Sequence, residues 1–131
     1  MHRLLIVLGC LMTFPAYAQA EDPCVTQRNM LEMNDCGQQQ LDKADRSLNQ
    51  AYQTLIKKFS EKDTPDSRNS VIKQYLVTAQ RAWISFREND CKAIYTYNEG
   101  GTIRNIAYLG CMTEHTEQRT KELKKEFVPA G

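Results

Sequence analysis

Beyond its first twenty residues, the chain has no apolar run long enough to cross a membrane, and its charges do not favour one sign. A membrane-spanning helix needs about 20 consecutive apolar residues. The 131 residues include 17 basic and 16 acidic side chains, and without the first twenty, which contain Arg3, 16 of each remain. A nucleic-acid-binding protein needs a basic surface. We therefore expect neither a membrane span nor a nucleic-acid partner.

Residues that carry enzyme chemistry are also scarce. His115 is the only histidine after residue 20, and we find no Ser-His-Asp set, phosphate-binding loop or cluster of metal ligands. Glu88 and Asp90 lie two positions apart, so on a helix they point to different faces and make a poor acid/base pair. His115, beside Glu114, is interpreted as a surface histidine. We expect no catalytic residue, no metal and no cofactor, and hence a protein that is not an enzyme.

The first twenty residues, MHRLLIVLGCLMTFPAYAQA, are typical of a secretory signal peptide. Arg3 precedes the apolar run, and Ala-x-Ala cleavage patterns end at Ala18 and Ala20. We expect cleavage after Ala20, with Ala18 as the alternative, leaving residues 21–131 as a single domain that is periplasmic or secreted. The run VLGC also resembles a lipoprotein cleavage box, whose use would make Cys10 the lipidated N-terminus.

Four cysteines remain after the signal: Cys24, Cys36, Cys91 and Cys111. An even number in a small exported domain predicts two disulfides. At a rise of about 1.5 Å per residue, Cys36 lies at a depth similar to that of Cys111, which favours this pair, with Cys24 bonded to Cys91. Cys24–Cys111 with Cys36–Cys91 is nearly as favourable, because a kink at Gly37 would change the depths. A Cys24–Cys36 bond would need a broken first helix, and the sequence leaves the pairing open.

Apolar residues recur at spacings of three and four along most of the chain, which predicts amphipathic helices. The first helix is expected from about Thr26 to Ser60, with Gly37 as a possible kink or break. Its apolar row is Leu41, Ala44, Leu48, Ala51, Leu55 and Phe59.

The second helix is expected to start with Thr64 as N-cap and Pro65 in its first turn, and to end near Tyr97. Its row in the same rhythm is Ile72, Tyr75, Leu76, Ala79, Trp83, Phe86 and Asp90. We interpret Trp83 and Phe86 as core residues. The glycines of NEGG, residues 98–101, are expected to supply a left-handed cap.

The third helix is expected to be capped by Thr102 and to run to about Phe127, with Gly110 as a place for another backbone to approach closely. No strand alternation of useful length appears. The predicted fold is all-α: an antiparallel helical hairpin with a third helix packed along it.

Several polar residues share helix faces with apolar ones, as Gln80 and Arg87 do with Trp83. Such groups need partners if they are buried, so we expect an ion pair of Asp45 with Arg87 or with Arg119. The predicted polar network comprises Asp45, Asn49, Tyr52, Gln80, Arg87 and Arg119. We interpret it as fixing helix register. The alternative is that part of it lines a ligand cleft, with Gln80 and Arg87 as the best candidates.

The order of the motifs resembles the LprI-type lysozyme inhibitor family. Met33-Asn34 precede Cys36, and residues 44–52 match the family pattern AD-x-x-LN-x-x-Y. Residues 79–91 match a helix that begins AQRAW-x-x-[FY]R and ends in a cysteine, here Cys91. A Gly-Gly turn, a further cysteine and a T-x-x-R-x-x-x-L tail complete the pattern at Gly100, Gly101, Cys111, Thr116, Arg119 and Leu123. Two departures are Glu88, where the family often has aspartate, and the signal, because the family's named member is a lipoprotein.

The resemblance implies a periplasmic binding protein that inhibits lysozyme. Such an inhibitor is expected to offer carboxylates to a basic enzyme cleft, and Glu32 and Asp35 are the candidates for this contact. Acids at a helix N-terminus are also favoured by the helix dipole alone. The alternative function is a structural or stress-related envelope protein that binds another protein or a small ligand. Its candidate surface is a basic face formed by Arg119, Lys121, Lys124 and Lys125, although a charged run on a terminal helix is usually just solvated.

Overall fold

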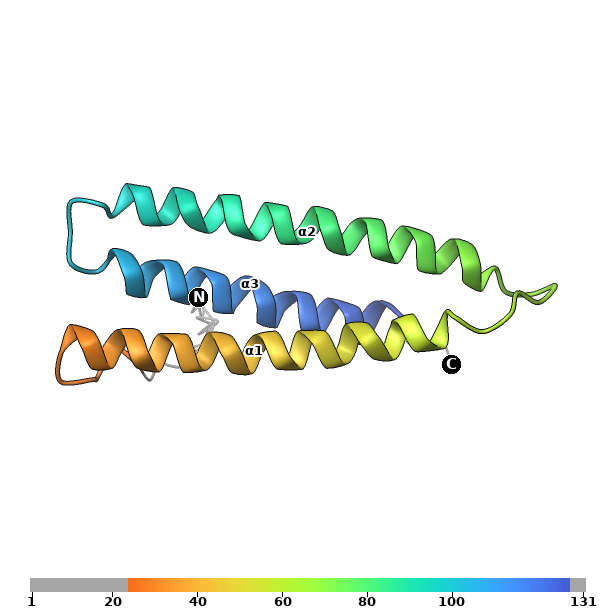
Figure 1. Ribbon diagram of the computed structural model, residues 1–131, viewed down its shortest axis with the longest axis horizontal. Coiled ribbons are helices and arrows are strands. Elements are labelled where there is room, and N and C mark those ends of the chain that lie inside the picture. Colours follow the sequence, from red (N-terminus) through yellow and green to blue (C-terminus); the bar gives the residue numbers. More distant parts are fainter. Residues whose placement is uncertain (1–23, 128–131) are drawn as a thin grey trace, which may run out of the picture.

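The computed structural model describes residues 24–127, which form three long helices (Figure 1). The helices are α1, Met30–Lys58, α2, Asn69–Tyr97, and α3, Arg104–Glu126. α3 packs along both other helices, whereas α1 and α2 contact each other sparingly. The predicted all-α fold is confirmed, and α3 is the helix that holds the other two together.

α1 begins where Asn29 caps it and continues through Gly37. The Asn29 Oδ1 atom accepts a hydrogen bond from the Glu32 backbone N–H at 3.0 Å, as an N-cap residue should. All six residues of the predicted apolar row are buried. A Cβ atom at Gly37 would lie 2.9 Å from Ile106 Cδ1. The predicted close approach of a backbone at Gly110 is wrong, because a Cβ there would meet nothing within 4 Å, whereas at Gly37 side chains of α3 approach closely.

The predicted start of the second helix is wrong, because Thr64 and Pro65 belong to a separate turn. Thr64 and Ser67 exchange two backbone hydrogen bonds, of 2.9 and 3.2 Å, and Pro65 takes the second position of this turn, which its fixed φ suits. α2 begins at Asn69, and the side chain of its N-cap residue, Arg68, makes no capping hydrogen bond.

The predicted glycine cap of α2 and the Thr102 cap of α3 are also wrong. Asn98 is the C-cap residue, with φ of −98°, and its side-chain amide donates to the Ile94 carbonyl at 2.8 Å. No glycine in residues 24–127 has a positive φ. α3 begins after Ile103, without a side-chain cap. An amide side chain thus binds one of the terminal carbonyls that a left-handed glycine would otherwise help to satisfy.

The core consists of two apolar clusters with polar residues between them. One cluster comprises Leu48, Leu55, Phe59, Leu76 and Leu123, and the other Leu41, Cys91, Leu109 and Met112. Three polar residues, Gln80 on α2 and Thr116 and Thr120 on α3, are also buried. Along each helix, they lie between the residues of one cluster and those of the other. This middle part of the bundle contains most of the predicted polar network.

The buried face of α2 differs from the predicted one. Leu76, Gln80 and Cys91 are buried, whereas Tyr75 and Ala79 are exposed. Trp83 is half-buried against the first cluster, but Phe86, predicted as core, is 54% exposed. The helix is rotated because the buried polar side chains have partners on α1 and α3.

The two predicted disulfides are confirmed, but the favoured pairing and its near-equal alternative are both wrong. The bonds are Cys24–Cys36 and Cys91–Cys111. α1 begins at Met30 rather than near Thr26, so residues 24–29 form a turn that brings Cys24 back to the second turn of the helix. Cys36 and Cys111 do have similar depths, but depth does not fix direction around a helix, and Cys111 faces α2.

Among residues 24–127, no helix combines the length and the apolar character that a membrane crossing requires. The predicted signal peptide, its cleavage sites and Cys10 lie outside the described residues.

Candidate functional site

Arg87 connects all three helices in the middle of the bundle. Its Nη1 atom donates to Asp45 Oδ1 on α1 at 2.8 Å and to Thr116 Oγ1 on α3 at 2.7 Å. The Arg87 side chain is 11% exposed, and that of Asp45 is 47% exposed. Of the two ion pairs considered from the sequence, the structure therefore contains the one between Asp45 and Arg87.

Thr116 is the buried anchor of this arrangement. It is fully buried, and its hydroxyl donates to the Met112 carbonyl at 2.6 Å while accepting from Arg87. Reasoning from the sequence placed Thr116 in a family motif but missed it as a network member. The sequence did contain a signal for its burial, because Thr116 follows the apolar Met112 by one helical turn and so lies on the inner face of α3.

Arg119 forms a second link, between α3 and α2. Its Nε atom donates to Gln80 Oε1 at 3.2 Å, and its Nη1 atom contacts Glu122 Oε2 at 3.3 Å. Gln80 is only 7% exposed. The network thus consists of two separate sets of hydrogen bonds, one around Arg87 and one around Arg119.

A groove lies between α1 and α2 beside these contacts. We call it the α1/α2 groove, and its volume is about 350 Å³. It is lined by Asp45, Leu48, Asn49, Tyr52, Gln53, Gln80, Trp83, Ile84 and Arg87. The groove thus gathers five of the six predicted network residues. Within residues 24–127, Asn49 and Tyr52 line it without a side-chain hydrogen-bond partner.

Both disulfides lie at one end of the bundle, where α1 begins and α2 turns into α3 (Figure 1). We call residues 24–42 and 88–111 the stapled end. It contains six acidic and three basic residues. The acidic residues are Glu32, Asp35, Asp42, Glu88, Asp90 and Glu99, and the basic ones are Arg28, Lys92 and Arg104.

Large apolar side chains are exposed at the same end. Tyr97 is 89% exposed and Leu31 is 71% exposed, and Val25, Ile94 and Ile103 are also exposed. Exposed apolar side chains that gather in one region mark surfaces that contact other molecules. The stapled end therefore combines negative charge, apolar side chains and covalent constraint.

The two acids predicted to bind a partner have different surroundings. Glu32 is engaged locally, because its Oε2 atom accepts from the Arg28 backbone N–H at 3.3 Å and lies 3.6 Å from Arg28 Nε. Asp35 is exposed and borders a shallow hollow with Asn34 and Asn105. Asp35 is therefore the better placed of the two for an outside partner.

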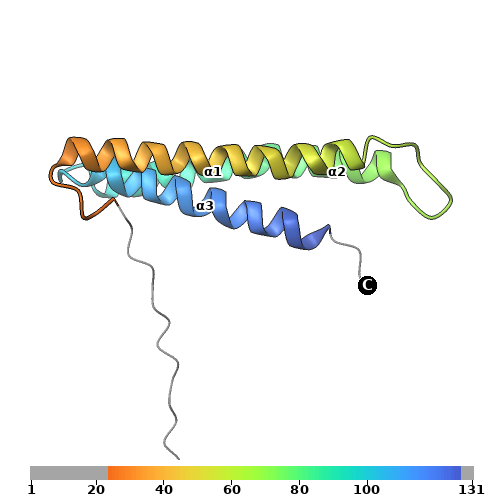
Figure 2. The ribbon, with the colours of Figure 1, turned by 90° about the horizontal axis from the view of Figure 1, so that it is seen from below.

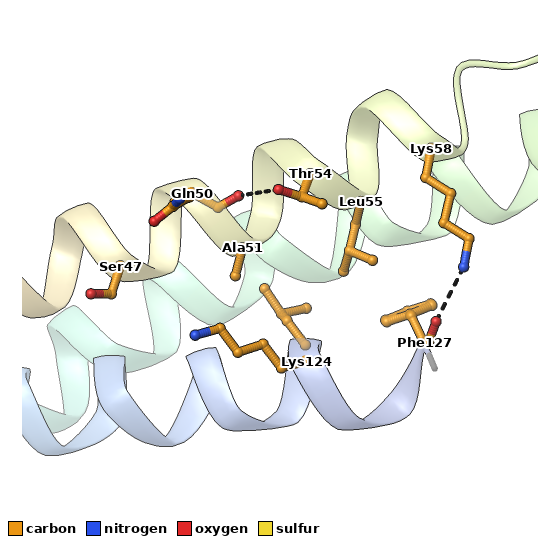
Figure 3. Close-up of a pocket in the computed structure, with 9 residues that line it drawn as sticks. Ser47, Gln50, Ala51, Thr54, Leu55, Lys58, Lys124 and Phe127 are labelled. Carbon is orange, nitrogen blue, oxygen red and sulfur yellow. Dashed lines mark hydrogen bonds between the residues drawn. The ribbon is translucent and has the colours of Figure 1, made fainter. Parts of the chain in front are cut away.

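A basic groove runs between α1 and α3 (Figure 3). Two adjoining hollows, which share Ser47 and Lys124, make up what we call the α1/α3 groove. Leu55, Leu123 and Phe127 line the hollow of about 440 Å³. Lysines border the groove along its length: Lys43, Lys58, Lys121 and Lys124. Figure 2 shows α3 diverging from α1 toward the end of the bundle opposite the stapled end. Lys58 Nζ donates to the Phe127 carbonyl at 3.2 Å.

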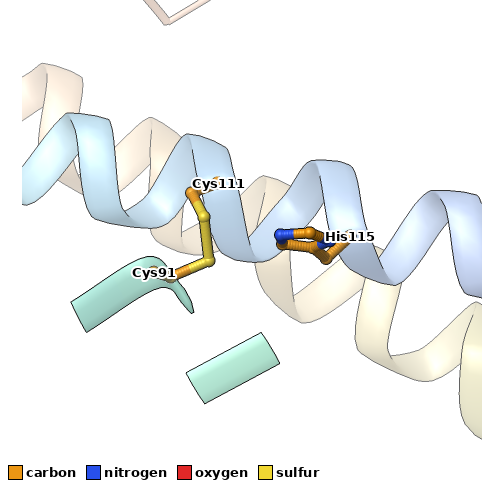
Figure 4. Close-up of side chains that lie close together, drawn as sticks. All are labelled: Cys91, Cys111 and His115. Atoms are coloured by element: carbon orange, nitrogen blue, oxygen red, sulfur yellow. A yellow bond between two sulfur atoms is a disulfide. The ribbon is translucent and has the colours of Figure 1, made fainter. Parts of the chain in front are cut away.

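His115 is more constrained than a free surface histidine. One ring nitrogen lies 2.8 Å from Asp90 Oδ2, and Phe86 packs edge-on against the ring at 5.2 Å. Cys91, Cys111 and His115 lie close enough together for their donor atoms to share a metal ion (Figure 4). However, the two sulfur atoms form a disulfide, and a metal site needs thiolates.

Comparison with known proteins agrees with the motifs. The family model "Lysozyme inhibitor LprI" matches residues 21–123. An uncharacterized protein of Rhizobium meliloti (strain 1021) is 32% identical over 127 residues, which cover 93% of this chain and 90% of that protein. No solved structure matches significantly. The chain belongs to the LprI lysozyme inhibitor family.

Proposed function

We propose that this protein is a periplasmic lysozyme inhibitor that binds the enzyme through its stapled end. The observation that carries the proposal is the location of carboxylates and exposed apolar side chains together at the end that holds both disulfides. Family membership supports lysozyme as the partner. The disulfides and the signal-like first twenty residues support export.

The distribution of charge supports the stapled end, rather than the opposite end, as the binding surface. A basic enzyme cleft is attracted to a negative surface, which speeds association and disfavours wrong orientations. The stapled end has six acidic and three basic residues, whereas residues 43–87 and 112–127 contain eight acidic and thirteen basic ones. A basic partner would therefore approach the stapled end first.

Rigidity supports the same assignment. Binding costs free energy when loops and side chains become ordered, and covalent constraint lowers this cost. Tyr97 is suited to the centre of such a contact, because tyrosine is enriched among the side chains that dominate binding energy. Asp35 lies on α1 at the same end and would supply a carboxylate.

The test is lysis of peptidoglycan by a c-type lysozyme in the presence of the oxidised protein. We expect dose-dependent inhibition that is lost after reduction and alkylation. Tyr97→Ala should raise the half-inhibitory concentration about tenfold or more, because a dominant contact contributes about 2 kcal/mol. Asp35→Ala should raise it less.

Matched controls are available at the other end of the molecule. Tyr75 is also on α2 and is 71% exposed, so Tyr75→Ala should leave inhibition unchanged, as should Asp66→Ala in the α1–α2 connection. Equal effects of Tyr97→Ala and Tyr75→Ala would contradict the assignment to the stapled end. Absence of inhibition at large molar excess would contradict the proposal for this lysozyme class.

The α1/α3 groove favours a second candidate function, which is binding of an acidic envelope protein. Its apolar floor and bordering lysines would suit an amphipathic segment with acidic flanks. Capture of such a partner from envelope extract, abolished by Lys43→Gln with Lys124→Gln and unaffected by Tyr97→Ala, would favour this function over the first. Lys57→Gln with Lys125→Gln is the control for charge alone.

A further inference from the structure

We propose that the exposed face of α2 is the contact surface of a homodimer, in which α2 packs antiparallel against α2 of a second copy about a two-fold axis at Phe86. α2 forms one edge of the bundle (Figure 1), and only three of its 29 residues are buried. This inference goes beyond lysozyme inhibition, because it concerns the association of two copies of this chain.

An apolar stripe, which we call the α2 stripe, runs along this face. Its residues are Tyr75, Ala79, Ala82, Phe86, Ala93 and Tyr97, and all six are exposed. Tyr97 is 89% exposed, Tyr75 71% and Phe86 54%. Apolar residues at spacings of three, four and seven are typical of a helix face that packs against another helix. α2 therefore has a second packing face, which α1 and α3 leave uncovered.

The α2 stripe is nearly symmetric about its centre, which points to a second copy as the occupant. Tyr75 and Tyr97 each lie eleven residues from Phe86, and Ala79 and Ala93 each lie seven residues from it. In a two-fold interface, if one residue contacts another across the axis, the reverse contact also occurs. An antiparallel pair centred on Phe86 would therefore place Tyr75 against Tyr97, Ala79 against Ala93, and the two phenylalanines against each other.

The spacing also lets the two helices approach closely. Eleven residues make about three helical turns, so the three aromatic residues lie almost in a straight line, about 16 Å apart. The alanines between them leave room for the aromatic rings of the second copy, as a helix separation of about 8–10 Å requires. The central ring is already held in place, because Phe86 packs edge-on against His115, with 5.2 Å between the ring centroids.

The α2 stripe is almost free of charge. The charged residues of α2 are Lys73, Arg81, Arg87, Glu88, Asp90 and Lys92. At about 100° per residue, only Asp90 falls within the stripe, and its Oδ2 atom lies 2.8 Å from a ring nitrogen of His115. The two Asp90 side chains of a dimer would be separated by about 12 Å along the helices, beyond the screening length of about 8 Å at physiological salt. Interface centres are likewise poor in charge and rich in aromatic residues.

The exposed area is sufficient for a dimer. An aromatic side chain buries about 150–250 Å², so at their exposed fractions the three aromatic residues offer about 400 Å² in each copy. Two copies would bury about 800 Å² from these side chains alone. The alanines and the polar flank of Thr78, Ser85 and Asn89, all exposed, raise the total above the 1,000 Å² or so that a specific interface needs.

Tyr97 would belong both to this interface and to the lysozyme-binding surface proposed above. The dimer would therefore have to dissociate before lysozyme binds. Inhibition measured below the dissociation constant of the dimer involves the monomer, so the expected result for Tyr75→Ala in that assay is unaffected.

Sedimentation velocity of the oxidised protein without lysozyme measures the association directly. We expect a monomer–dimer equilibrium with a Kd on the order of 10 μM, because the area is near the lower end for specific interfaces. Phe86→Glu places two carboxylates against each other at the axis and should raise the Kd at least about 100-fold. Tyr75→Ala and Tyr97→Ala should each raise it about tenfold, by similar factors, because the two tyrosines contact each other.

Ile84→Glu is the matched control. Ile84 is 40% exposed and lies two residues from Phe86, on the opposite side of α2. This variant adds the same charge to an exposed apolar position and should leave the Kd unchanged. Helix content by circular dichroism shows that each variant is folded.

Cross-linking tests the antiparallel arrangement. A short bis-maleimide reacts with an added thiol and leaves the native disulfides intact. A mixture of Ala79→Cys and Ala93→Cys proteins should cross-link, because these positions face each other. Ala79→Cys alone should not, because its two copies would be about 21 Å apart along the helices.

The proposal would be overturned by a protein that stays monomeric up to millimolar concentration, or by a dimer that persists in Phe86→Glu. Loss of the dimer in Ile84→Glu would also overturn it, since that side chain lies away from the α2 stripe. Efficient cross-linking of Ala79→Cys alone would contradict the antiparallel pairing. Because these assays contain no lysozyme, their failure would not affect the proposed inhibition.

Discussion

At the scale of single residues, Arg87 is the side chain on which most of the interior depends. One guanidinium group bonds to α1 through Asp45 and to α3 through Thr116, while its flat face lies over Trp83. Because Thr116 is fully buried, its hydroxyl cannot exchange this partner for water. A buried group that loses its partner is destabilising beyond the value of the bond itself.

Arg87→Met should therefore lower the free energy of unfolding by about 1–3 kcal/mol. The half-exposed Asp45 regains water in this variant, which keeps the loss below that of a fully buried pair. Urea unfolding followed by circular dichroism measures the change. Arg81→Met, at an exposed position of α2, is the control, and an equal loss there would contradict the role of Arg87.

The two helical glycines Gly37 and Gly110 should respond in opposite directions to substitution. At Gly110 a Cβ meets nothing within 4 Å, so Gly110→Ala should stabilise the protein by about 0.5–1 kcal/mol. Gly37→Val should destabilise it by about 1–3 kcal/mol, because a Cβ there already lies 2.9 Å from Ile106 Cδ1 and 3.1 Å from Leu109 Cδ1. Thermal unfolding of both variants would show the contrast, and a stabilised Gly37→Val would contradict the close packing of α1 and α3.

At the scale of elements, the start of α2 is capped by Asp63, a residue of the connection that precedes the helix. Asp63 accepts from the backbone N–H and the hydroxyl of Ser70, at 2.7 and 2.6 Å. Ser70 is the second residue of α2, so this carboxylate satisfies one of the free N–H groups of its first turn. The Thr64–Ser67 turn brings Asp63 back to this position.

This contact makes the start of α2 sensitive to pH. Hydrogen bonds from the Ser70 hydroxyl, and then from its backbone N–H, hold the pKa of Asp63 below its ordinary value. A lowered folded pKa means that the stabilisation is present above the ordinary value, about 3.9, and is lost as the pH falls through the folded pKa. Protection of the Ser70 amide from hydrogen exchange should therefore decrease in acid.

Asp63→Asn should reduce this protection at neutral pH and make the remainder independent of pH in the acid range. Asp66→Asn, in the same connection, is the control. An acid-dependent loss of Ser70 protection that persisted in Asp63→Asn would contradict the assignment of the cap.

At the scale of the whole molecule, the bundle has two different ends. Both disulfides and an excess of acids lie at the stapled end, and an excess of basic residues lies toward the other end. Figure 2 shows that α3 also diverges from α1 toward the unstapled end. One end is therefore held by covalent bonds, and the other by noncovalent contacts, which include packing and the hydrogen bond from Lys58 to the Phe127 carbonyl.

Removing the Cys91–Cys111 bond with Cys91→Ala and Cys111→Ala should lower the free energy of unfolding by about 3 kcal/mol, as expected for its 20-residue separation. Removing Cys24–Cys36, with a separation of 12, should have a smaller effect on global stability. It should instead free residues 24–29, measured as faster hydrogen exchange there. Equal global losses for the two double variants would contradict this division between a bundle staple and a local one.

The sequence by itself determined the helices, the inner face of α1 and the presence of two disulfides. Spacings of three and four place Leu41 to Phe59 on one stripe, and this local periodicity needs no tertiary information. An even number of cysteines in a small chain with a signal-like start likewise predicts disulfide bonds but not which cysteines pair. The partnership of Asp45 with a guanidinium was predictable for the same reason, because charge next to an apolar row needs a partner.

Only the tertiary structure decided which residues pair with each other and which way their side chains face around each helix. The disulfide pairing depends on where α1 begins and on which way Cys111 faces around α3. The depth of a residue along a helix axis specifies neither of these. The inner face of α2 includes Gln80 and excludes Phe86, because polar groups on α1 and α3 make burial of amide and guanidinium groups favourable. Composition and periodicity describe one segment at a time, whereas burial of a polar side chain depends on what the neighbouring helices offer it.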